Sequence, residues 1–253
     1  MTDMEQAERE LWIRSFHPAP GACRLLCLPH AGGSSSFFFP LSAALAAEVN
    51  MQAVQYPGRQ DRRKEPPLTS IDALADALFR ALDLDDDSPL ALFGHSMGAV
   101  VGFELARRLE AEGRPPVAFF ASGRRSPLLP SAEAVHKLGD AGLLAELRRL
   151  NGTELALLND EEILQMIIPS LRADFTAVET YRPAAAPPLT CPVIAMVGDA
   201  DPRVTVAEAG AWSETTDGRF ELLVHPGGHF YLATRKEAVT AQILDRLRSG
   251  ALA

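Results

Sequence analysis

Residues 90–106 read LALFGHSMGAVVGFELA, with Ser96 placed between Gly94 and Gly98. One apolar run ends just before Gly94, and a second begins directly after Gly98. The first run has the length of a buried strand and the second has helical spacing. The stretch therefore predicts a strand, a tight turn at Ser96 and a helix at 97–112. A serine on such a turn, in the pattern G-x-S-x-G, is typical of a nucleophile presented for catalysis.

The geometry of the turn explains why both flanking residues are glycines. The turn is so sharp that Cβ atoms at positions 94 and 98 would collide with the adjacent strand and helix. The helix that follows also directs its unpaired N–H groups at the place where negative charge develops during acyl transfer.

Outside this stretch, short apolar runs alternate with segments of helical spacing. This alternation predicts an α/β fold with a mostly parallel sheet and helices on both faces, formed by residues 1–253 as a single domain. Ser70 is expected to cap one of the helices. The strand candidates are 24–28, 51–56, 90–93, 117–121, 193–197 and 220–224. The helix candidates are 38–49, 71–84, 97–112, 204–216 and 236–248.

The alternation stops between residues 121 and 193, where helix signals replace strand signals. Helices are expected at 140–150 and from residue 161 onward, with Asn159 and Glu162 spaced as a capping box. Pro169 predicts a kink or a break into two helices. Residues 124–188 are thus expected to form a helical insertion over one edge of the strand carboxyl ends, where open α/β sheets bind ligands. It is interpreted as a lid, and the alternative is a purely structural subdomain.

Composition excludes several classes of function. The formal net charge of −9 argues against nucleic acid as a partner. The N-terminal residues lack the pattern of a signal peptide and no run is long enough to cross a membrane, so we expect a cytoplasmic protein. The cysteines, Cys23, Cys27 and Cys191, lack metal-site spacing and are interpreted as buried apolar residues, so neither a metal nor another cofactor is expected.

Basic residues gather at three places. Arg59, Arg62, Arg63 and Lys64 form one cluster, Arg124 and Arg125 a second, and Arg148 and Arg149 a third. The simpler interpretation is solvated surface. The alternative is that one cluster, with Arg124 and Arg125 as the candidate, guides an acidic partner to the site.

A serine hydroxyl needs a base. In this architecture the acid and then the histidine follow the serine in the chain, which leaves His136, His225 and His229. His229 is preferred to His225 because Gly227 and Gly228 give its loop the freedom to reach Ser96.

The acid is expected at the end of the strand that precedes the histidine, where Asp199 and Asp201 are the candidates. The usual spacing after Gly198 selects Asp201, whose role is to hold the imidazole tautomer. Asp199 is expected to cap the loop.

Two backbone N–H groups are expected to bind the oxyanion. One belongs to Met97, the residue after the nucleophile. The other is assigned to Ala31, in a loop where Gly32 and Gly33 allow the backbone to approach substrate. His30 is interpreted as a structural side chain of that loop, and the phenylalanines at 37–39 as core packing.

Five motifs in this order and spacing resemble the type II, or editing, thioesterases of polyketide and nonribosomal peptide synthesis. They are PHAGGSSSFFFP, QYPGRQDRRKEPP, FGHSMGA, GDADPRV and PGGHFYL. The resemblance covers residues 12–247 and implies an α/β-hydrolase fold with a helical lid. It further implies Ser96, Asp201 and His229 as catalytic residues, with Ala31 and Met97 as oxyanion donors.

The implied substrates are acyl groups on the phosphopantetheine thiol of acyl or peptidyl carrier proteins, and phosphopantetheine enters only as part of the partner. We expect a monomer that needs no cofactor. The alternatives are a medium-chain fatty acyl-carrier-protein thioesterase, a small-ester carboxylesterase, or a non-catalytic binding module. A non-catalytic module is expected to have lost one of the catalytic residues, and the sequence shows no such loss.

Overall fold

The computed structural model describes residues 3–19, 23–131, 133–150 and 161–250. In these residues seven strands form one sheet in the order β1-β3-β2-β4-β5-β6-β7. The strands are β1 (Ile13–Ser15), β2 (Cys23–Leu28), β3 (Val49–Val54), β4 (Leu90–His95), β5 (Ala118–Ser122), β6 (Val193–Gly198) and β7 (Phe220–His225). All neighbouring pairs are parallel except β1 with β3. The α/β class is confirmed, and each of the six predicted strands is present.

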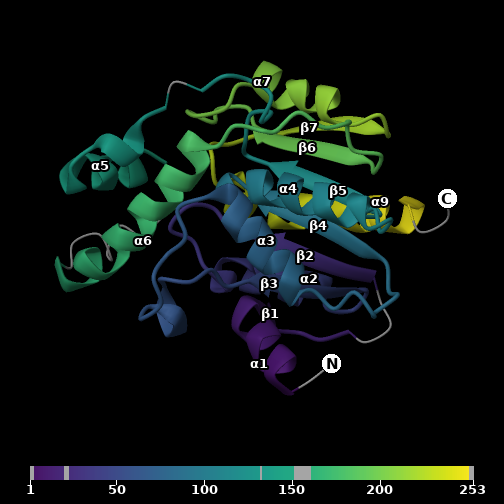
Figure 1. The fold of residues 1–253 in the computed structure, drawn as a ribbon. Coiled ribbons are helices and arrows are strands. Elements are labelled where there is room, and N and C mark those ends of the chain that lie inside the picture. The colour runs from purple at the N-terminus through teal and green to yellow at the C-terminus, as the bar shows by residue number, and fades with distance from the viewer. Residues whose placement is uncertain (1–2, 20–22, 132, 151–160, 251–253) are drawn as a thin grey trace.

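Helices cover both faces of this sheet (Figure 1). On one face, α3 (Ile71–Ala81) packs against α4 (Met97–Ala111), and α1 (Asp3–Trp12) packs against α3. On the other, α2 (Phe39–Leu45) packs against α9 (Lys236–Gly250). Side chains of a strand point alternately to the two faces, so Leu26 joins one apolar core and Leu25 the other.

The strand order creates a switch point beside β2. From β2 the chain crosses to β3 on one side, and β4 lies on the other side of β2. Helix α2 then covers one face and α4 the opposite face, so the loops after β2 and β4 diverge at the sheet's carboxyl edge. Ligands bind in the crevice that such a divergence leaves. Ala31 and Ser96 lie in these two loops.

The insertion between β5 and β6 contains η3 (Val135–Lys137), α5 (Asp140–Leu150) and α6 (Glu161–Thr180). Figure 1 shows α5 and α6 beside the sheet, on the side away from the C-terminus. Of the kink or break expected at Pro169, the break into two helices does not occur, because α6 is continuous through this residue. Proline removes only one backbone donor, and Leu171 and Phe175 hold the rest of α6 in an apolar cluster with α5. Asn159, the expected cap, lies outside the described residues.

Smaller differences occur at the ends of elements. Ser70 caps α3 as predicted, accepting a hydrogen bond from the Ala73 N–H. The helix expected at 204–216 consists of α7 (Val206–Gly210) followed by the 3-10 helix η5 (Ala211–Thr215). A further 3-10 turn, η1 (Ser35–Phe38), precedes α2, and another, η2 (Gln60–Arg62), follows β3. The short helix α8 (Tyr231–Thr234) precedes α9. In the described part of the chain, no helix is both long enough and apolar enough to cross a membrane.

Candidate active site

Ser96 lies on a strained turn at the junction of β4 and α4. Its φ is 54°, a left-handed conformation that side chains other than glycine rarely adopt. Its N–H donates to the Ser122 carbonyl oxygen at 2.8 Å, which ties the turn to β5. Ser96 occupies the N-cap of α4 yet makes no capping bond with its side chain. It is partly exposed between the buried His95 and Met97, so its hydroxyl is available to a substrate.

The flanking glycines are required by close backbone packing. A Cβ at Gly94 would lie 2.2 Å from the Gly98 carbonyl oxygen, and a Cβ at Gly98 would lie 2.0 Å from the Leu28 carbonyl oxygen. Real Cβ atoms do not approach this closely, so the predicted reason for both glycines is confirmed. The contact with Leu28 also brings the turn against the end of β2.

His229 and Asp201 form a buried pair. His229 Nδ1 lies 2.8 Å from Asp201 Oδ2, and the side chains are 2% and 0% exposed. Because a carboxylate only accepts, His229 Nδ1 carries the proton and Nε2 is left free to act as a base. The Arg203 N–H donates to the other carboxylate oxygen at 2.8 Å, which fixes the orientation of Asp201.

The loops that carry this pair are joined through their backbones. A Cβ at Gly198 would lie 2.3 Å from the Gly227 carbonyl oxygen, so the loop after β6 touches the loop after β7 directly. Gly227 donates its N–H to Asp199 Oδ1 at 2.9 Å. Asp199 therefore fastens the two loops together, in line with the loop role expected for it.

His229 also lies beside the serine turn. Its ring centroid is 5.2 Å from that of His95, the residue before Ser96. A Cβ at Gly123, directly after β5, would lie 2.7 Å from His95 Cε1 and 3.5 Å from His229 Cε1. The loops after β4, β5 and β7 thus meet at one place at the carboxyl edge of the sheet.

Two further histidines lie behind this place. Burial and the nearby His229 and Arg59 lower the pKa of His30 to about 3. Burial, with His229 and His30 nearby, holds the pKa of His95 well below its ordinary value. Both rings are therefore neutral at physiological pH and add no charge beside His229.

His95 is oriented by a short hydrogen-bonded chain that sequence reasoning missed. Its Nδ1 lies 2.9 Å from Ser122 Oγ, which lies 2.7 Å from the Tyr231 hydroxyl. His95 could have been found from the sequence, because it lies inside the serine motif. No sequence pattern indicates Ser122 or Tyr231.

The two predicted oxyanion donors lie on either side of the contact between β2 and the serine turn. Met97 is the first residue of α4, where backbone N–H groups have no partner within the helix. In the β2 loop, Gly32 donates its N–H to Asp174 and Gly33 donates to the His30 carbonyl oxygen. Among the described residues, the Ala31 N–H has no acceptor. It is therefore free to bind a substrate oxygen.

The remaining candidate histidines lie elsewhere. His225 stacks on Tyr231, with ring centroids 4.7 Å apart. His136 bonds through Nδ1 to the buried carboxylate of Glu179 in α6. Of the candidates, His229 is the one that the structure places against Asp201.

Taken together, a serine on a strained turn, a carboxylate-bound histidine and two free amides can support acyl transfer. Comparison with known proteins agrees with this chemistry. Residues 23–247 match the family model described as the thioesterase domain.

The chain belongs to the thioesterase family.

Among its relatives is the thioesterase PikA5 of Streptomyces venezuelae, 47% identical over 251 residues that make up 98% of this chain and 89% of PikA5. Another is the probable cadicidin biosynthesis thioesterase of Streptomyces griseus, 47% identical over 93% of this chain and 66% of that protein. Among solved structures, the type II thioesterase BorB from the borrelidin biosynthetic cluster is 50% identical, with a TM-score of 0.88 over 94% of this chain and 98% of BorB. The α/β-hydrolase fold is thereby confirmed.

One surface prediction for this thioesterase is wrong. Arg124 is only 6% exposed and bonds to Glu133 at 3.2 Å. Arg125 pairs with Glu133 and Glu208. Arg125 also donates to the Arg203 carbonyl oxygen and so joins the insertion to the loop that carries Asp201. The two arginines do not form a free basic patch. The first cluster also departs from solvated surface, since Arg59 and Arg62 are buried.

Glu133 is the centre of this internal network. Burial alone would raise its pKa, but Arg124 and Arg203 outweigh that effect and hold the pKa at about 2. Arg203 lies 2.9 Å from Glu133, and its backbone N–H is the one that orients Asp201.

The three phenylalanines that were interpreted as core differ from one another. Phe38 is buried in the core, and Phe39 is 50% exposed. Phe37 packs edge-on against His30 and stacks on His95, so it lies beside the candidate site and is not simply core.

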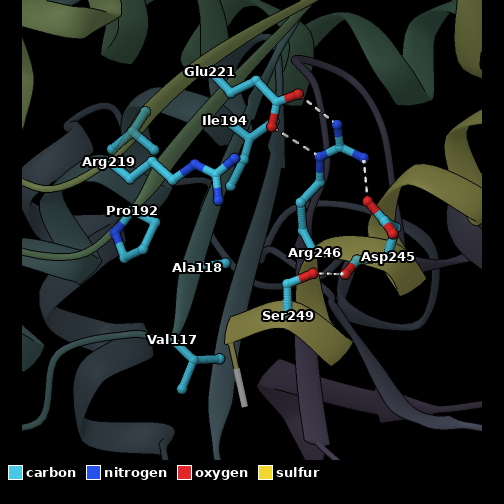
Figure 2. Close-up of a pocket in the computed structure, with 10 residues that line it drawn as sticks. Val117, Ala118, Pro192, Ile194, Arg219, Glu221, Asp245, Arg246 and Ser249 are labelled. Carbon is cyan, nitrogen blue, oxygen red and sulfur yellow. Dashed lines mark hydrogen bonds and ion pairs between the residues drawn. The ribbon is translucent and has the colours of Figure 1, made fainter. Parts of the chain in front are cut away.

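A cavity of about 300 Å³ lies at the opposite edge of the sheet, and Figure 2 shows the residues that line it. Its lining includes Val117, Pro192 and Arg219, which directly precede β5, β6 and β7, and an ion pair between Glu221 and Arg246. It therefore lies at the end of the sheet opposite to Ser96 and is not part of the candidate site. In the described residues, no cluster of His, Cys, Asp or Glu side chains could hold a metal ion.

Proposed function

We propose that this chain is a type II thioesterase that hydrolyses acyl groups from the phosphopantetheine thiol of acyl or peptidyl carrier proteins, clearing misloaded or stalled units in polyketide or nonribosomal peptide synthesis. The main support for hydrolysis is that His229, bound to Asp201, lies beside the strained Ser96 turn. The assignment to editing is supported by the relatives, which include a type II thioesterase from the borrelidin cluster.

In the proposed reaction, Ser96 Oγ attacks the thioester carbonyl while His229 Nε2 takes its proton. The N–H groups of Ala31 and Met97 bind the carbonyl oxygen as it becomes negative. The C–S bond then breaks, and the thiol leaves with the proton that His229 held. A thiol has a pKa of about 8.5, so a thiolate leaving group needs protonation less than an alkoxide would.

In the second half, water replaces the thiol. His229 takes a proton from the water as its oxygen attacks the acyl-Ser96 carbonyl, and it returns that proton to Ser96 Oγ as the ester bond breaks. The free acid and the original enzyme result. Asp201 keeps the imidazole in one tautomer and stabilises its charged form during both halves.

We infer that the insertion, residues 124–188, is the lid over the acyl chain. Ala31 packs against an apolar cluster that the insertion contributes, including Leu147, Leu171 and Phe175. An acyl chain whose carbonyl oxygen binds the Ala31 N–H would begin beside this cluster. We further propose that the enzyme acts as a cytoplasmic monomer without metal or other cofactor. Light scattering and activity after chelation test the oligomeric state and the metal.

The deciding experiment is mass spectrometry of carrier proteins loaded with a panel of acyl groups, incubated with wild type and with Ser96→Ala. We expect the wild type to unload them and Ser96→Ala to leave them loaded, while the exposed-site control Ser213→Ala behaves as wild type. Unloading by Ser96→Ala at the wild-type rate would remove the proposed mechanism.

Substrate class is tested by comparing carrier-bound, coenzyme A-bound and p-nitrophenyl esters of one acyl group. We expect kcat/KM for the carrier-bound substrate to exceed the others by at least about tenfold, because only that substrate brings protein contacts to the transition state. Equal values, or a preference for the free ester, would instead identify a small-ester carboxylesterase.

A further inference from the structure

A buried ion pair joins the insertion to the loop after β3. Asp174 in α6 accepts two hydrogen bonds from Arg59, Nη1 to Oδ2 at 2.7 Å and Nη2 to Oδ1 at 2.8 Å. The side chains are 1% and 7% exposed. Burial disfavours the charged form of Arg59, but the Asp174 carboxylate outweighs this and raises the pKa of Arg59, so the guanidinium stays charged.

Both partners of this pair also bind the backbone of the loop after β2. Asp174 Oδ2 accepts the Gly32 N–H at 2.7 Å. Arg59 Nη1 donates to the Gly33 carbonyl oxygen at 3.1 Å. The pair therefore fixes one polar group on each of the two glycines that follow Ala31. Neither glycine can hold itself in place through a side chain.

The contacts at Gly33 also act on the direction of the Ala31 N–H, through the planar peptide unit between His30 and Ala31. The His30 carbonyl and the Ala31 N–H belong to the same peptide, and they point in opposite directions because that peptide is trans. The Gly33 N–H donates to the His30 carbonyl oxygen at 2.9 Å. Holding Gly33 therefore holds the His30 carbonyl, and with it the direction of the Ala31 N–H.

Packing agrees with this chain of contacts. Gly32 has φ +75°, and a Cβ there would lie 2.9 Å from Leu171 Cδ1 of α6. Helix α6 thus touches the β2 loop through Leu171 and through Asp174, one turn apart. A buried ion pair is a poor source of net stability compared with apolar packing, because both charges lose their hydration.

We propose that Asp174 and Arg59 are positioning residues that aim the Ala31 N–H at the oxyanion and so couple the position of α6 to the rate of acyl transfer. This rests on the proposed function, in which Ala31 is an oxyanion donor. Misdirecting that amide weakens binding of the transition state and leaves binding of the ground-state substrate largely intact.

The test is the kinetics of Asp174→Asn and Arg59→Lys on an acyl-carrier substrate. Asp174→Asn removes the charge, and Arg59→Lys keeps the charge while removing the two-pronged contact. We expect kcat to fall about 10- to 100-fold in both, with KM changed by no more than about twofold. Affinity for an alkylboronic acid, which forms a tetrahedral adduct with the serine, is expected to fall by a similar factor.

The matched control is Glu104→Gln in α4. Glu104 is also a buried carboxylate bound by arginines, Arg107 and Arg108, and it accepts from the Tyr181 hydroxyl, but it makes no contact with the β2 loop. We expect this variant to lose stability while keeping kcat and boronate affinity. A purely structural role for Asp174 predicts the same behaviour for Asp174→Asn.

Wild-type kcat and boronate affinity in Asp174→Asn would overturn the proposal. If that variant does not fold, Arg59→Lys decides by the same criterion. Failure of the proposed function is separate, because it would appear as an active Ser96→Ala. Loss of activity in Ser96→Ala with normal kinetics in both pair variants refutes this inference alone.

Discussion

His229 Nδ1 lies 2.8 Å from Asp201 Oδ2, although 28 positions separate the two residues in the sequence. The pair is buried, and Asp201 is oriented from its other side by the Arg203 N–H. A histidine held in this way keeps one ring nitrogen protonated and presents the other to its surroundings.

Asp201→Asn tests this relationship. The asparagine side chain offers an N–H group where Nδ1 needs an acceptor, so the imidazole is no longer held in the useful tautomer. We expect kcat to fall by about 10⁴-fold with thermal stability nearly unchanged. The control is Asp199→Asn, whose Oδ1 can still accept the Gly227 N–H. Steady-state kinetics of both variants distinguishes the two carboxylates, and a greater loss in Asp199→Asn would reverse their assigned roles.

Gly98→Ala tests the packing of the serine turn. The added Cβ would lie 2.0 Å from the Leu28 carbonyl oxygen, so β2 or α4 must shift. We expect the free energy of unfolding to fall by about 3 kcal/mol, measured by urea denaturation. Gly139→Ala places its Cβ in open space and is expected to change stability by no more than about 0.5 kcal/mol. Equal stability of the two variants would contradict the close contact.

Glu133→Gln tests the network between the insertion and the Asp201 loop. The substitution leaves the buried Arg124 without its carboxylate partner, so we expect a loss of about 3 kcal/mol in denaturant unfolding. In the wild type this contribution is present above the ordinary glutamate pKa of 4.5 and disappears as the pH falls toward 2. Glu237→Gln removes an exposed pair with Lys236 and serves as the control. If Glu133→Gln loses no more free energy of unfolding than Glu237→Gln, Glu133 contributes no more than an exposed surface charge.

Because of His30, we expect the folded protein to lose stability in mild acid. Its pKa is about 3 in the folded protein and 6.5 ordinarily, so below pH 6.5 the unfolded chain binds a proton that the folded chain excludes. Stability from this group is complete above that pH and declines by about 1.4 kcal/mol per pH unit as the pH falls toward 3. Denaturant unfolding between about pH 7 and pH 5 measures the slope. We expect a shallower slope in His30→Gln, with the remainder due in part to His95, and an unchanged slope would contradict the prediction.

The sequence predicted elements that have a strong local pattern. The strands β4 and β6 and the helix α5 are found where apolar periodicity placed them. The strand β1 was missed because three residues are too few to show a period, and it is defined only by pairing with β3. Periodicity could not identify it.

Long-range side-chain contacts were predicted less well. Asp201 and His229, which the structure pairs, had been selected because Asp201 follows Gly198 at a typical spacing and because Gly227 and Gly228 give the histidine loop freedom. Arg124 was misjudged, since nothing local indicates that Glu133 covers it. The pair of Arg59 and Asp174 was not anticipated either, because 115 positions separate its members and a buried charge resembles a surface charge in the sequence.

The contact at Gly198 has a consequence for how a product can leave. With no side chain between them, the acid and histidine loops meet backbone to backbone and are joined by a hydrogen bond to Asp199, so we expect them to behave as a single unit. We therefore expect this wall to stay still through turnover. We expect room for a new acyl chain to be made instead where α6 packs on the loop after β2.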